Sequence, residues 1–344
     1  MGGGLLQLVA YGAQDVYLTG NPQITFFKVV YRRHTNFSIE SIQQTFNGNI
    51  NPSSRVTCQI SRNGDLVHKL YIAFANVANN TSSTEYIDKV EIEIGGQMID
   101  RQYGEWMEIW NELSLPIGKK EGFTQMTSRA TATEYKYLPL EFWFCRNIGL
   151  ALPLIALQYH EVKINIEFSS SLPADADATL WADYIFLDTD ERRRFAQLSH
   201  EYLIEQVQFT GSEQMASGKL TAKLSFNHPV KELIWKGATA GCGKAKLMLN
   251  GNDRFAEREE KYFTHVQPYQ HHTNIPAANK YINVYSFALK PEEHQPSGTL
   301  NMSRIDTAQL RLDAGTTTQT VSIYAHSYNV LRILSGMGGL AYSN

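Results

Sequence analysis

The sequence predicts an all-β protein built from two similar halves, with short helices confined to the connections. Three observations support this prediction. Period-two alternation of apolar and polar residues recurs along the chain, helical periodicity is scarce, and the second half repeats the order of motifs found in the first. With 344 residues, of which 43% are hydrophobic, the chain is long enough for each half to bury a core of its own.

The first half contains a series of strand patterns. Residues 86–94 (YIDKVEIEI) and 162–168 (VKINIEF) alternate β-branched with charged or polar residues, so that one face of each strand lies in a core and the other in water. The Asn-Gly pair within residues 62–65 (RNGD) is a strong hairpin signal. The strands that we expect in this half are residues 24–31, 56–60, 66–77, 86–94, 138–144, 162–168 and 180–188.

Residues 104–113 form the clearest helical pattern of the first half. Trp106 and Trp110 belong to an apolar stripe at helical spacing, and such aromatic residues are more typical of a core than of a ligand cage. The segment at residues 114–136 is polar and contains glycine. We therefore expect a surface loop there.

A densely charged run at residues 188–200 (DTDERRRFAQLSH) separates the halves. We interpret it as a solvated connector; the alternative is an interface or anionic site built on Arg192, Arg193 and Arg194. Strand patterns resume after this run, and helical periodicity is limited to short pieces such as residues 257–263. The strands expected in the second half are residues 202–209, 220–226, 230–235, 245–249, 281–289, 308–312 and 321–331.

The second half answers the first motif by motif. A strand, a glycine turn and a short helix at residues 90–113 are matched by residues 246–268. Later pairs follow in the same order with similar spacing, as expected of a duplicated domain. These pairs are 137–144 with 281–289, 162–168 with 308–313, and 183–193 with 324–334.

About eight strands in each half fit two consecutive antiparallel eight-stranded jelly rolls with short helices in their loops. The division that we expect follows from the repeat and from the charged run. It consists of an N-terminal arm at residues 1–23, a first jelly roll at 24–190, a connector at 191–200, a second jelly roll at 201–335 and a C-terminal tail at 336–344.

Composition excludes several classes of function. The formal charge of −3 argues against a protein that binds nucleic acid by neutralising phosphates over its surface. Three cysteines, Cys58, Cys145 and Cys242, lack metal-site spacing and are expected to be reduced thiols. No secretion signal or membrane span is expected, so the sequons at Asn36, Asn79, Asn80 and Asn301 are expected to carry no glycan.

Two stretches resemble known functional motifs, but neither has the residues or the spacing that the motif requires. Residues 239–244 (TAGCGK) resemble a phosphate-binding loop but lack its first glycine and its Ser/Thr. The histidines near residues 265–294 invite comparison with cupin metal sites, yet two of them are adjacent, and on a strand they would point to opposite faces. We therefore predict no catalytic residue, no cofactor and no metal, and we assign these histidines to loops and interfaces. They are His265, His271, His272 and His294, beside Glu292 and Glu293.

Several long and unusual sequence motifs occur in a fixed order along the chain. They include ITFFKVVYRRHTNFS, LPIGKKEGF, FWFCRNIGLALPLIALQYHEVKI, DYIFLDTDERRRFAQLSHEYLIEQ and YSFALKPEEHQPSGTLNMSRID. In these stretches the sequence resembles the major capsid proteins of the nucleocytoplasmic large DNA viruses. The resemblance implies a double jelly roll, a homotrimeric capsomer of pseudo-hexagonal outline that tiles an icosahedral virus shell, and no enzymatic activity. The short loops of this chain imply that tall surface towers are absent.

The resemblance also suggests partners and a location. We expect contacts with the other subunits of a homotrimer and with neighbouring capsomers, made by Arg192, Arg193, Arg194, His271, His272, Glu292, Glu293 and His294. The arm and the tail are expected on the inner side of the shell, against minor capsid or penton proteins or an internal membrane. The expected location is the outer capsid of the virion, after assembly in the cytoplasm of an infected host cell.

Two other functions remain open from the sequence. A carbohydrate-binding jelly roll would need exposed aromatic side chains beside polar groups, whereas most Trp and Tyr residues here fall within strand patterns. A metal-dependent enzyme of the cupin type is disfavoured by the spacing of the histidines.

Overall fold

The computed structural model describes residues 2–77, 81–128 and 135–343. The chain divides into an arm, Met1–Asn36, and a body, Phe37–Asn344, which are described separately. The arm contains two short helices, α1 (Gly3–Val9) and α2 (Asp15–Thr19). The strand expected at residues 24–31 is absent, so that prediction was wrong for the chain by itself. A strand needs a neighbouring edge, and the arm offers none.

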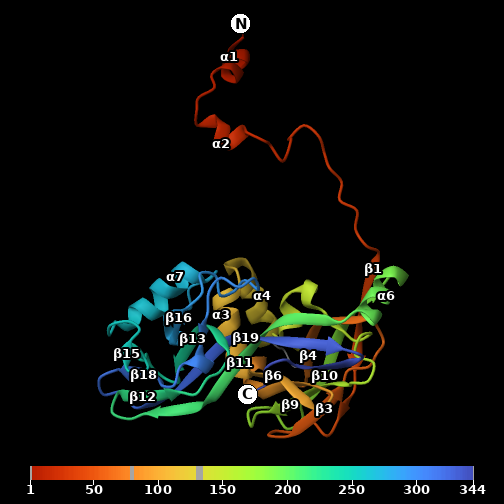
Figure 1. Ribbon diagram of the computed structural model, residues 1–344. Coiled ribbons are helices and arrows are strands. Elements are labelled where there is room, and N and C mark those ends of the chain that lie inside the picture. Colours follow the sequence, from red (N-terminus) through yellow and green to blue (C-terminus); the bar gives the residue numbers. More distant parts are fainter. Residues whose placement is uncertain (1, 78–80, 129–134, 344) are drawn as a thin grey trace. The chain divides into compact units, whose positions relative to one another are not determined.

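The first barrel of the body is a sandwich of two antiparallel sheets (Figure 1). One sheet has the order β1-β10-β4-β7, with β8 also on β4; the other has the order β2-β3-β9-β5-β6. The strands of the first sheet are β1 (Phe37–Gln44), β10 (Asp177–Leu187), β4 (Leu66–Ala75), β7 (Lys136–Pro139) and β8 (Leu152–Pro153). Those of the second are β2 (Phe46–Asn47), β3 (Arg55–Gln59), β9 (Val162–Phe168), β5 (Ile87–Ile94) and β6 (Gln97–Tyr103).

The second barrel repeats this arrangement. Its first sheet has the order β11-β19-β13-β16, with β17 on β13 and β20 on β19, and its second sheet has the order β12-β18-β14-β15. The strands of the first sheet are β11 (His200–Met215), β19 (Gln319–Leu334), β13 (Pro229–Gly237), β16 (Ile282–Ser286), β17 (Leu300–Asn301) and β20 (Met337–Leu340). Those of the second are β12 (Lys219–Leu224), β18 (Ala308–Asp313), β14 (Lys244–Leu249) and β15 (Asn252–Asp253).

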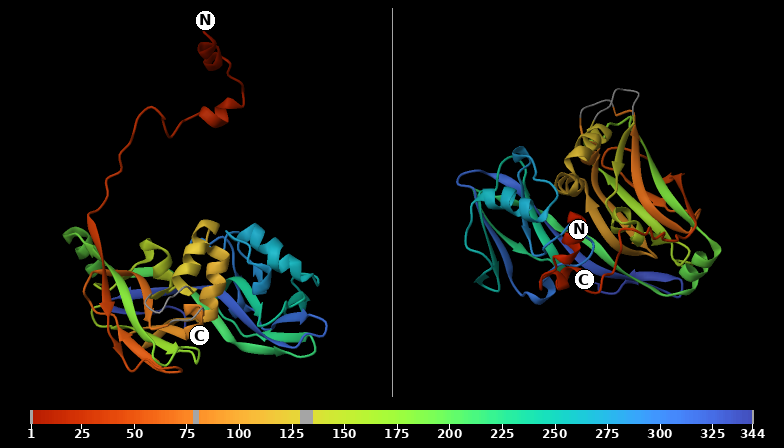
Figure 2. Two further views of the ribbon diagram at one scale, coloured as in Figure 1. Left: turned by 180° about the vertical axis from the view of Figure 1, so that it is seen from behind. Right: turned by 90° about the horizontal axis from the view of Figure 1, so that it is seen from above.

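Identical strand orders confirm the double jelly roll and the internal repeat. Strands β1, β10, β4 and β7 of the first barrel correspond to β11, β19, β13 and β16 of the second, and β3, β9, β5 and β6 correspond to β12, β18, β14 and β15. In each half of the body, the two sheets of the barrel face each other (Figure 2). The repeat read from the sequence is therefore a repeat of fold.

Each barrel buries its own apolar core, as predicted. Phe74 and Phe168 lie in the first core, and Trp235 and Phe263 lie in the second. All three cysteines are free and buried, and burial raises the pKa of the Cys145 and Cys242 thiols to about 12. The cysteines therefore behave as small core residues, because a protonated thiol is a poor nucleophile.

The helices lie in the connections, and some of them correct the sequence prediction. Helix α3 (Gly104–Ser114) is confirmed, whereas α4 (Ile117–Ser128) occupies much of the expected loop at 114–136. Helix α5 (Trp143–Arg146) replaces the second part of the strand expected at 138–144. The remaining elements are η1 (Ser83–Tyr86), η2 (Ile148–Leu150), η3 (Tyr262–Val266), α7 (Gln267–His271), η4 (Ala278–Lys280) and η5 (Met302–Arg304).

The charged run forms a helix, α6 (Thr189–Gln197), where a connector was expected. The Asp188 side chain accepts a hydrogen bond from the Thr189 N–H at the start of this helix. Acidic residues in its first turn and Arg194 in its last turn complement the helix dipole. At the C-terminus, the expected tail contains strand β20, which pairs with β19.

Among the described residues, no helix is both long and apolar enough to cross a membrane.

Candidate functional site

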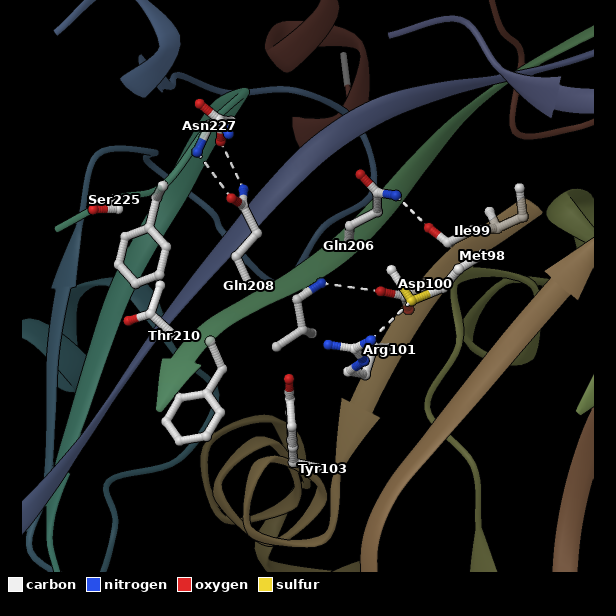
Figure 3. A pocket seen from close by; sticks show the side chains of 13 residues that line it. Met98, Ile99, Asp100, Arg101, Tyr103, Gln206, Gln208, Thr210, Ser225 and Asn227 are labelled. Atoms are coloured by element: carbon white, nitrogen blue, oxygen red, sulfur yellow. Dashed lines mark hydrogen bonds between the residues drawn. The ribbon is translucent and has the colours of Figure 1, made fainter. Parts of the chain in front are cut away.

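The described residues offer no catalytic centre. They contain no group of three or more His, Cys, Asp or Glu side chains that could hold a metal ion. A cavity of about 220 Å³ lies between β6 and β11, and burial raises the pKa of Asp100 in its wall to about 7 (Figure 3). Its amide side chains bond to their own chain; Gln208 Nε2, for instance, donates to the Asn227 carbonyl oxygen at 2.6 Å. The polar side chains of this cavity are therefore engaged within the chain itself.

The seam between the two barrels is built on helix α3. One face of this helix packs against the outer face of the β11-β19-β13-β16 sheet, where Ile234, Val284 and Tyr324 alternate with residues that point into the second core. The Trp106 and Tyr324 rings lie 5.6 Å apart. The stripe on α3 is buried as predicted, although the core that it fills lies between the barrels.

A buried chain of alternating glutamate and histidine side chains crosses the same sheet. His272 lies between two glutamates, with Nε2 2.9 Å from Glu232 Oε2 and Nδ1 2.9 Å from Glu292 Oε1. His326 continues the chain, with Nδ1 3.1 Å from Glu232 Oε1 and Nε2 3.2 Å from Glu205 Oε2. Both histidine side chains are fully buried. Each of these carboxylates therefore has at least one histidine ring nitrogen as a partner, and a buried carboxylate needs such a partner.

The first barrel reaches this chain through Arg146 of α5. Its Nη1 donates to Glu205 Oε2 at 2.9 Å, and its guanidinium lies 4.0 Å from the centre of the Trp110 ring. Lys231 approaches Glu205 from the second barrel, with Nζ 2.7 Å from Oε1. Glu205 thus joins a cation from each barrel, and the cluster ties the two barrels to each other.

The environment sets the charge state of this cluster. Burial alone raises the pKa of Glu205, but hydrogen bonds from His294 and His326 and the charge of Lys231 hold it well below its usual value. Burial alone lowers the pKa of His272, but the charge of Glu232 and the hydrogen bonds that the ring donates to Glu232 and Glu292 raise it to about 9. Glu205 is therefore ionised and His272 is protonated at neutral pH.

We expect His272 to make the stability of the body depend on pH. Because its pKa is raised in the folded state, its contribution is fully present below about pH 6.5 and is lost as the pH rises through about 9. The difference in free energy of unfolding between wild type and His272→Gln should therefore shrink by about 3 kcal/mol across that window. Chemical denaturation at a series of pH values measures this difference.

The neighbouring His271 supplies the control. Its Nδ1 lies 2.9 Å from the Leu289 carbonyl oxygen, so His271→Gln removes an adjacent imidazole without touching the contacts of His272 with Glu232 and Glu292, and the effect of His272→Gln is measured against this variant. A constant difference between wild type and His272→Gln from pH 6 to pH 10 would show that His272 is not charged in the fold.

The structure brings together three of the residues singled out in the sequence. His272, Glu292 and His294 belong to the buried cluster; His294 Nδ1 lies 3.4 Å from Glu205 Oε1. The His272 side chain is fully buried and serves the seam inside the chain. Glu293 pairs with Lys290 at the surface.

The three arginines lie together on α6, the helix that connects the first barrel to the second. The histidines singled out in the sequence lie in connections of the second barrel. Arg192 Nε lies 2.9 Å from Asp65 Oδ1, Arg194 pairs with Glu191, and Arg193 is exposed. Their role as subunit contacts stays a prediction. Of the four sequons, Asn79 and Asn80 lie outside the described residues.

Sequence reasoning missed the residues at the centre of the cluster. Lys231 and Glu232 are adjacent charges within an otherwise apolar strand pattern at residues 230–235, which was a usable signal of a buried ion pair. Arg146, Glu205 and His326 gave no such signal, because they meet only through tertiary contacts.

The first barrel has an open sheet face equivalent to the one that α3 covers. On the outer face of the β1-β10-β4-β7 sheet, Tyr71 is paired with Trp181, and their rings stack at 6.3 Å. Tyr137 of β7 lies 6.1 Å from Tyr71 and is itself exposed. In the second barrel, the corresponding strands β13 and β19 place Ile234 opposite Tyr324. An aromatic surface thus stands where the second barrel has a filled interface.

The second barrel has an open helix face equivalent to that of α3. Helices α3 and η3–α7 follow corresponding strands, and Met107 and Phe263 occupy equivalent places in the two cores. The seam stripe of α3 is Trp106, Ile109, Trp110 and Leu113, and the same spacing in η3–α7 gives Tyr262, His265, Val266 and Tyr269. Val266 is 40% exposed and Tyr269 is 78% exposed. Helix α3 lies in the middle of the body and α7 at the end formed by the second barrel (Figures 1 and 2).

Comparison with known proteins identifies the family. The family description "Major capsid protein N-terminus" matches residues 25–188, and "Large eukaryotic DNA virus major capsid protein" matches residues 191–240 and 236–339. The major capsid protein of Pyramimonas orientalis virus is 56% identical over 400 residues, and that of Paramecium bursaria Chlorella virus 1 is 45% identical over 439 residues. Both alignments cover 100% of each chain.

Solved structures agree with these sequence relatives. The crystal structure of PBCV-1 VP54, fitted into a reconstruction of the virophage Sputnik, superposes with a TM-score of 0.86 at 40% identity, covering 93% of this chain and 100% of that one. The Faustovirus major capsid protein shares the fold, with a TM-score of 0.75 at 11% identity over 94% of each chain. The chain therefore belongs to the family of large eukaryotic DNA virus major capsid proteins.

Proposed function

We propose that three copies of this chain form a ring of six barrels, and that this ring is the pseudo-hexagonal capsomer of an icosahedral virus shell. Membership of the family makes the chain a structural component of a virus capsid and not an enzyme. One observation supports the trimer. Each barrel has an open face, the outer sheet face in the first barrel and the η3–α7 face in the second, and these two faces correspond to the two sides of the filled seam.

The filled seam supplies the template for the contact between copies. Within the chain, α3 of the first barrel packs on the outer sheet face of the second barrel. In the ring, η3–α7 of one copy packs on the equivalent sheet face of the next copy, so that Val266 and Tyr269 meet Tyr71 and Trp181. Apolar and aromatic groups lie on both sides of this contact, as is typical of permanent interfaces.

Closure follows from the alternation of the two contacts. Each chain has one open helix face and one open sheet face on different barrels, so the contact is head-to-tail and generates a ring if the rotation closes. Three chains of two barrels give six similar units around a threefold axis. A trimer can thereby occupy a position with sixfold surroundings, which is what a tiled shell requires.

Further contacts of the capsomer belong to the same proposal. The ring packs against neighbouring capsomers, and its arm and inner face meet minor capsid or penton proteins or an internal membrane. The arm supports an inner contact of this kind, because nearly all of its large apolar side chains are exposed in the single chain. Assembly takes place in the cytoplasm of the infected host cell.

Light scattering on the purified full-length protein tests the trimer. The expected mass is three times 38.9 kDa. A protein that stays monomeric at micromolar concentration, with its body folded, would rule out this contact.

A carbohydrate-binding function has one observation in its favour. Tyr135, Tyr137, Tyr71 and Trp181 form an aromatic ladder across the open sheet, exposed at the two outer tyrosines and half-buried at Tyr71 and Trp181, and such rings can stack on the faces of sugar rings. The two functions require different states of this surface. A monomer whose Trp fluorescence shifts on titration with oligosaccharides would favour sugar binding, whereas a trimer buries the ladder.

A further inference from the structure

Residues 24–31 (ITFFKVVY) carry a strong strand sequence without a strand. Six of the eight residues are β-branched or aromatic and apolar, a composition typical of strands. These six side chains are 71 to 97% exposed in the structure. The family match begins at residue 25, so this segment is part of the family's common sequence.

The backbone of this segment lacks the hydrogen bonds that its sequence favours. Within the described part of the chain, residues 24–31 belong to no ladder, and the Phe27 N–H donates only to the Thr25 hydroxyl at 3.4 Å. A strand at residues 24–31 therefore still needs an edge to pair with.

Strand β1 of the body offers a suitable edge. It is eight residues long, as is the arm segment, and it pairs with β10 on one side while its other side is the edge of the sheet. Residues 37–41 are exposed, and they include the apolar side chains of Phe37 and Ile39. An exposed apolar edge of this kind is a template for an added strand.

Charge favours a second copy of the chain as the partner. Lys28, Arg32 and Arg33 give the arm, with its single Asp15, a net charge of +2, whereas residues 37–344 carry a net charge of −5. Glu40 lies exposed on β1 itself. The basic end of the arm is therefore attracted to the acidic body of a neighbour.

We infer that residues 24–31 add as a strand to the free edge of β1 in a second copy of this chain, so that each subunit of the ring is strapped to the next. This inference rests on the proposed homotrimer and names a second contact within it. The backbone groups of the arm pair with β1, and one apolar face of the added strand covers Phe37 and Ile39. Insertion into a lipid bilayer cannot satisfy the same groups, because a lone strand leaves them unpaired in hydrocarbon.

Hydrogen exchange on the purified full-length protein tests the strap. In the trimer, alternate amides among residues 24–31 should exchange about a hundredfold more slowly than amides of the flanking arm, because only every second N–H points to the partner edge. The same measurement on Trp181→Asp, which removes the helix–sheet contact between copies, should show no such protection.

Proline substitutions supply a second readout. Either Val29→Pro or Val30→Pro, but not both, should speed trimer dissociation about tenfold, since only one of these residues donates to the ladder. Leu18→Asp, an exposed position in α2 of the same arm, is the control and should change dissociation less than twofold.

The outcomes separate the strap from the trimer itself. A trimer of the expected mass with uniform fast exchange across residues 24–31 overturns the strap and leaves the capsomer intact. Protection that persists in monomeric Trp181→Asp reveals a hairpin within one chain, and protection that requires added phosphatidylglycerol vesicles reveals a membrane contact; both overturn the inference. A monomeric wild type refutes the capsomer and the strap together, and the mass measurement identifies that case.

Discussion

Replacing Lys231 with methionine is expected to lower the free energy of unfolding by about 3 kcal/mol. The Lys231 side chain is 1% exposed, and its Nζ lies 2.7 Å from Glu205 Oε1. Removing one partner of a buried ion pair leaves an uncompensated charge and costs about 3 to 5 kcal/mol. The lower figure applies because Arg146 and His326 still contact Glu205. Urea denaturation of the purified protein measures the loss.

Two variants make this test specific. Lys290→Met breaks the surface pair with Glu293, both of whose side chains are more than half exposed, and should cost less than about 1 kcal/mol. The double variant Lys231→Met with Glu205→Gln should recover part of the stability, because the unpaired charge is gone. Equal losses for the two lysine variants would mean that the buried cluster contributes no more than a surface pair.

Replacing Trp181 with aspartate is expected to abolish the trimer while the barrels stay folded. Trp181 lies on the open sheet face, so a polar side chain there is tolerated in the single chain. In the ring the same carboxylate would be buried without a partner in three interfaces at once, at a cost of about 2 kcal/mol or more in each. Light scattering and circular dichroism on the same sample measure the mass and the fold.

The other side of the contact should behave in the same way. Tyr269→Asp places a carboxylate on the η3–α7 face and should also give a folded monomer. Tyr342→Asp alters an exposed tyrosine elsewhere on the body and should leave the trimer intact. A trimer that survives both Trp181→Asp and Tyr269→Asp would place the subunit interface on different surfaces.

Strands with a clear alternation could be predicted from the sequence, and so could the repeat. Residues 86–94 and 162–168 became β5 and β9, because their apolar residues form one fully buried face and their charged or polar residues form a face that is on the whole less buried. Strand β1 escaped prediction, since most of its residues are exposed on both faces. The segment at residues 24–31 shows the opposite error: local propensity favours a strand, but a strand needs an edge that the single chain does not supply.

Helices within polar stretches were also missed. Helix α4 carries no clear apolar stripe. Helix α6 is capped by Asp188 and is so strongly charged, with none of its residues fully buried, that its sequence suggested a solvated connector. Residues 143–146 are aromatic and apolar enough to suggest a strand, yet they turn into α5 and thereby carry Arg146 to the seam.

The sequence indicated some members of the candidate site without their role. The cluster of His272, Glu292 and His294 was noticed, but it was assigned to loops and contacts with other subunits, whereas the structure places these side chains in and around a buried network. Glu205 and Arg146 come from different barrels and are 59 residues apart. Their meeting depends on how the barrels pack, which no local pattern encodes.

We expect the seam inside the chain to be repeated between chains. Single-particle cryo-electron microscopy of the purified full-length protein would show this contact. The expected particle is a ring of six barrels in which η3–α7 of each copy covers the Tyr71 and Trp181 face of the next. A particle in which that face stays open to solvent, or in which the copies meet through other surfaces, would contradict it.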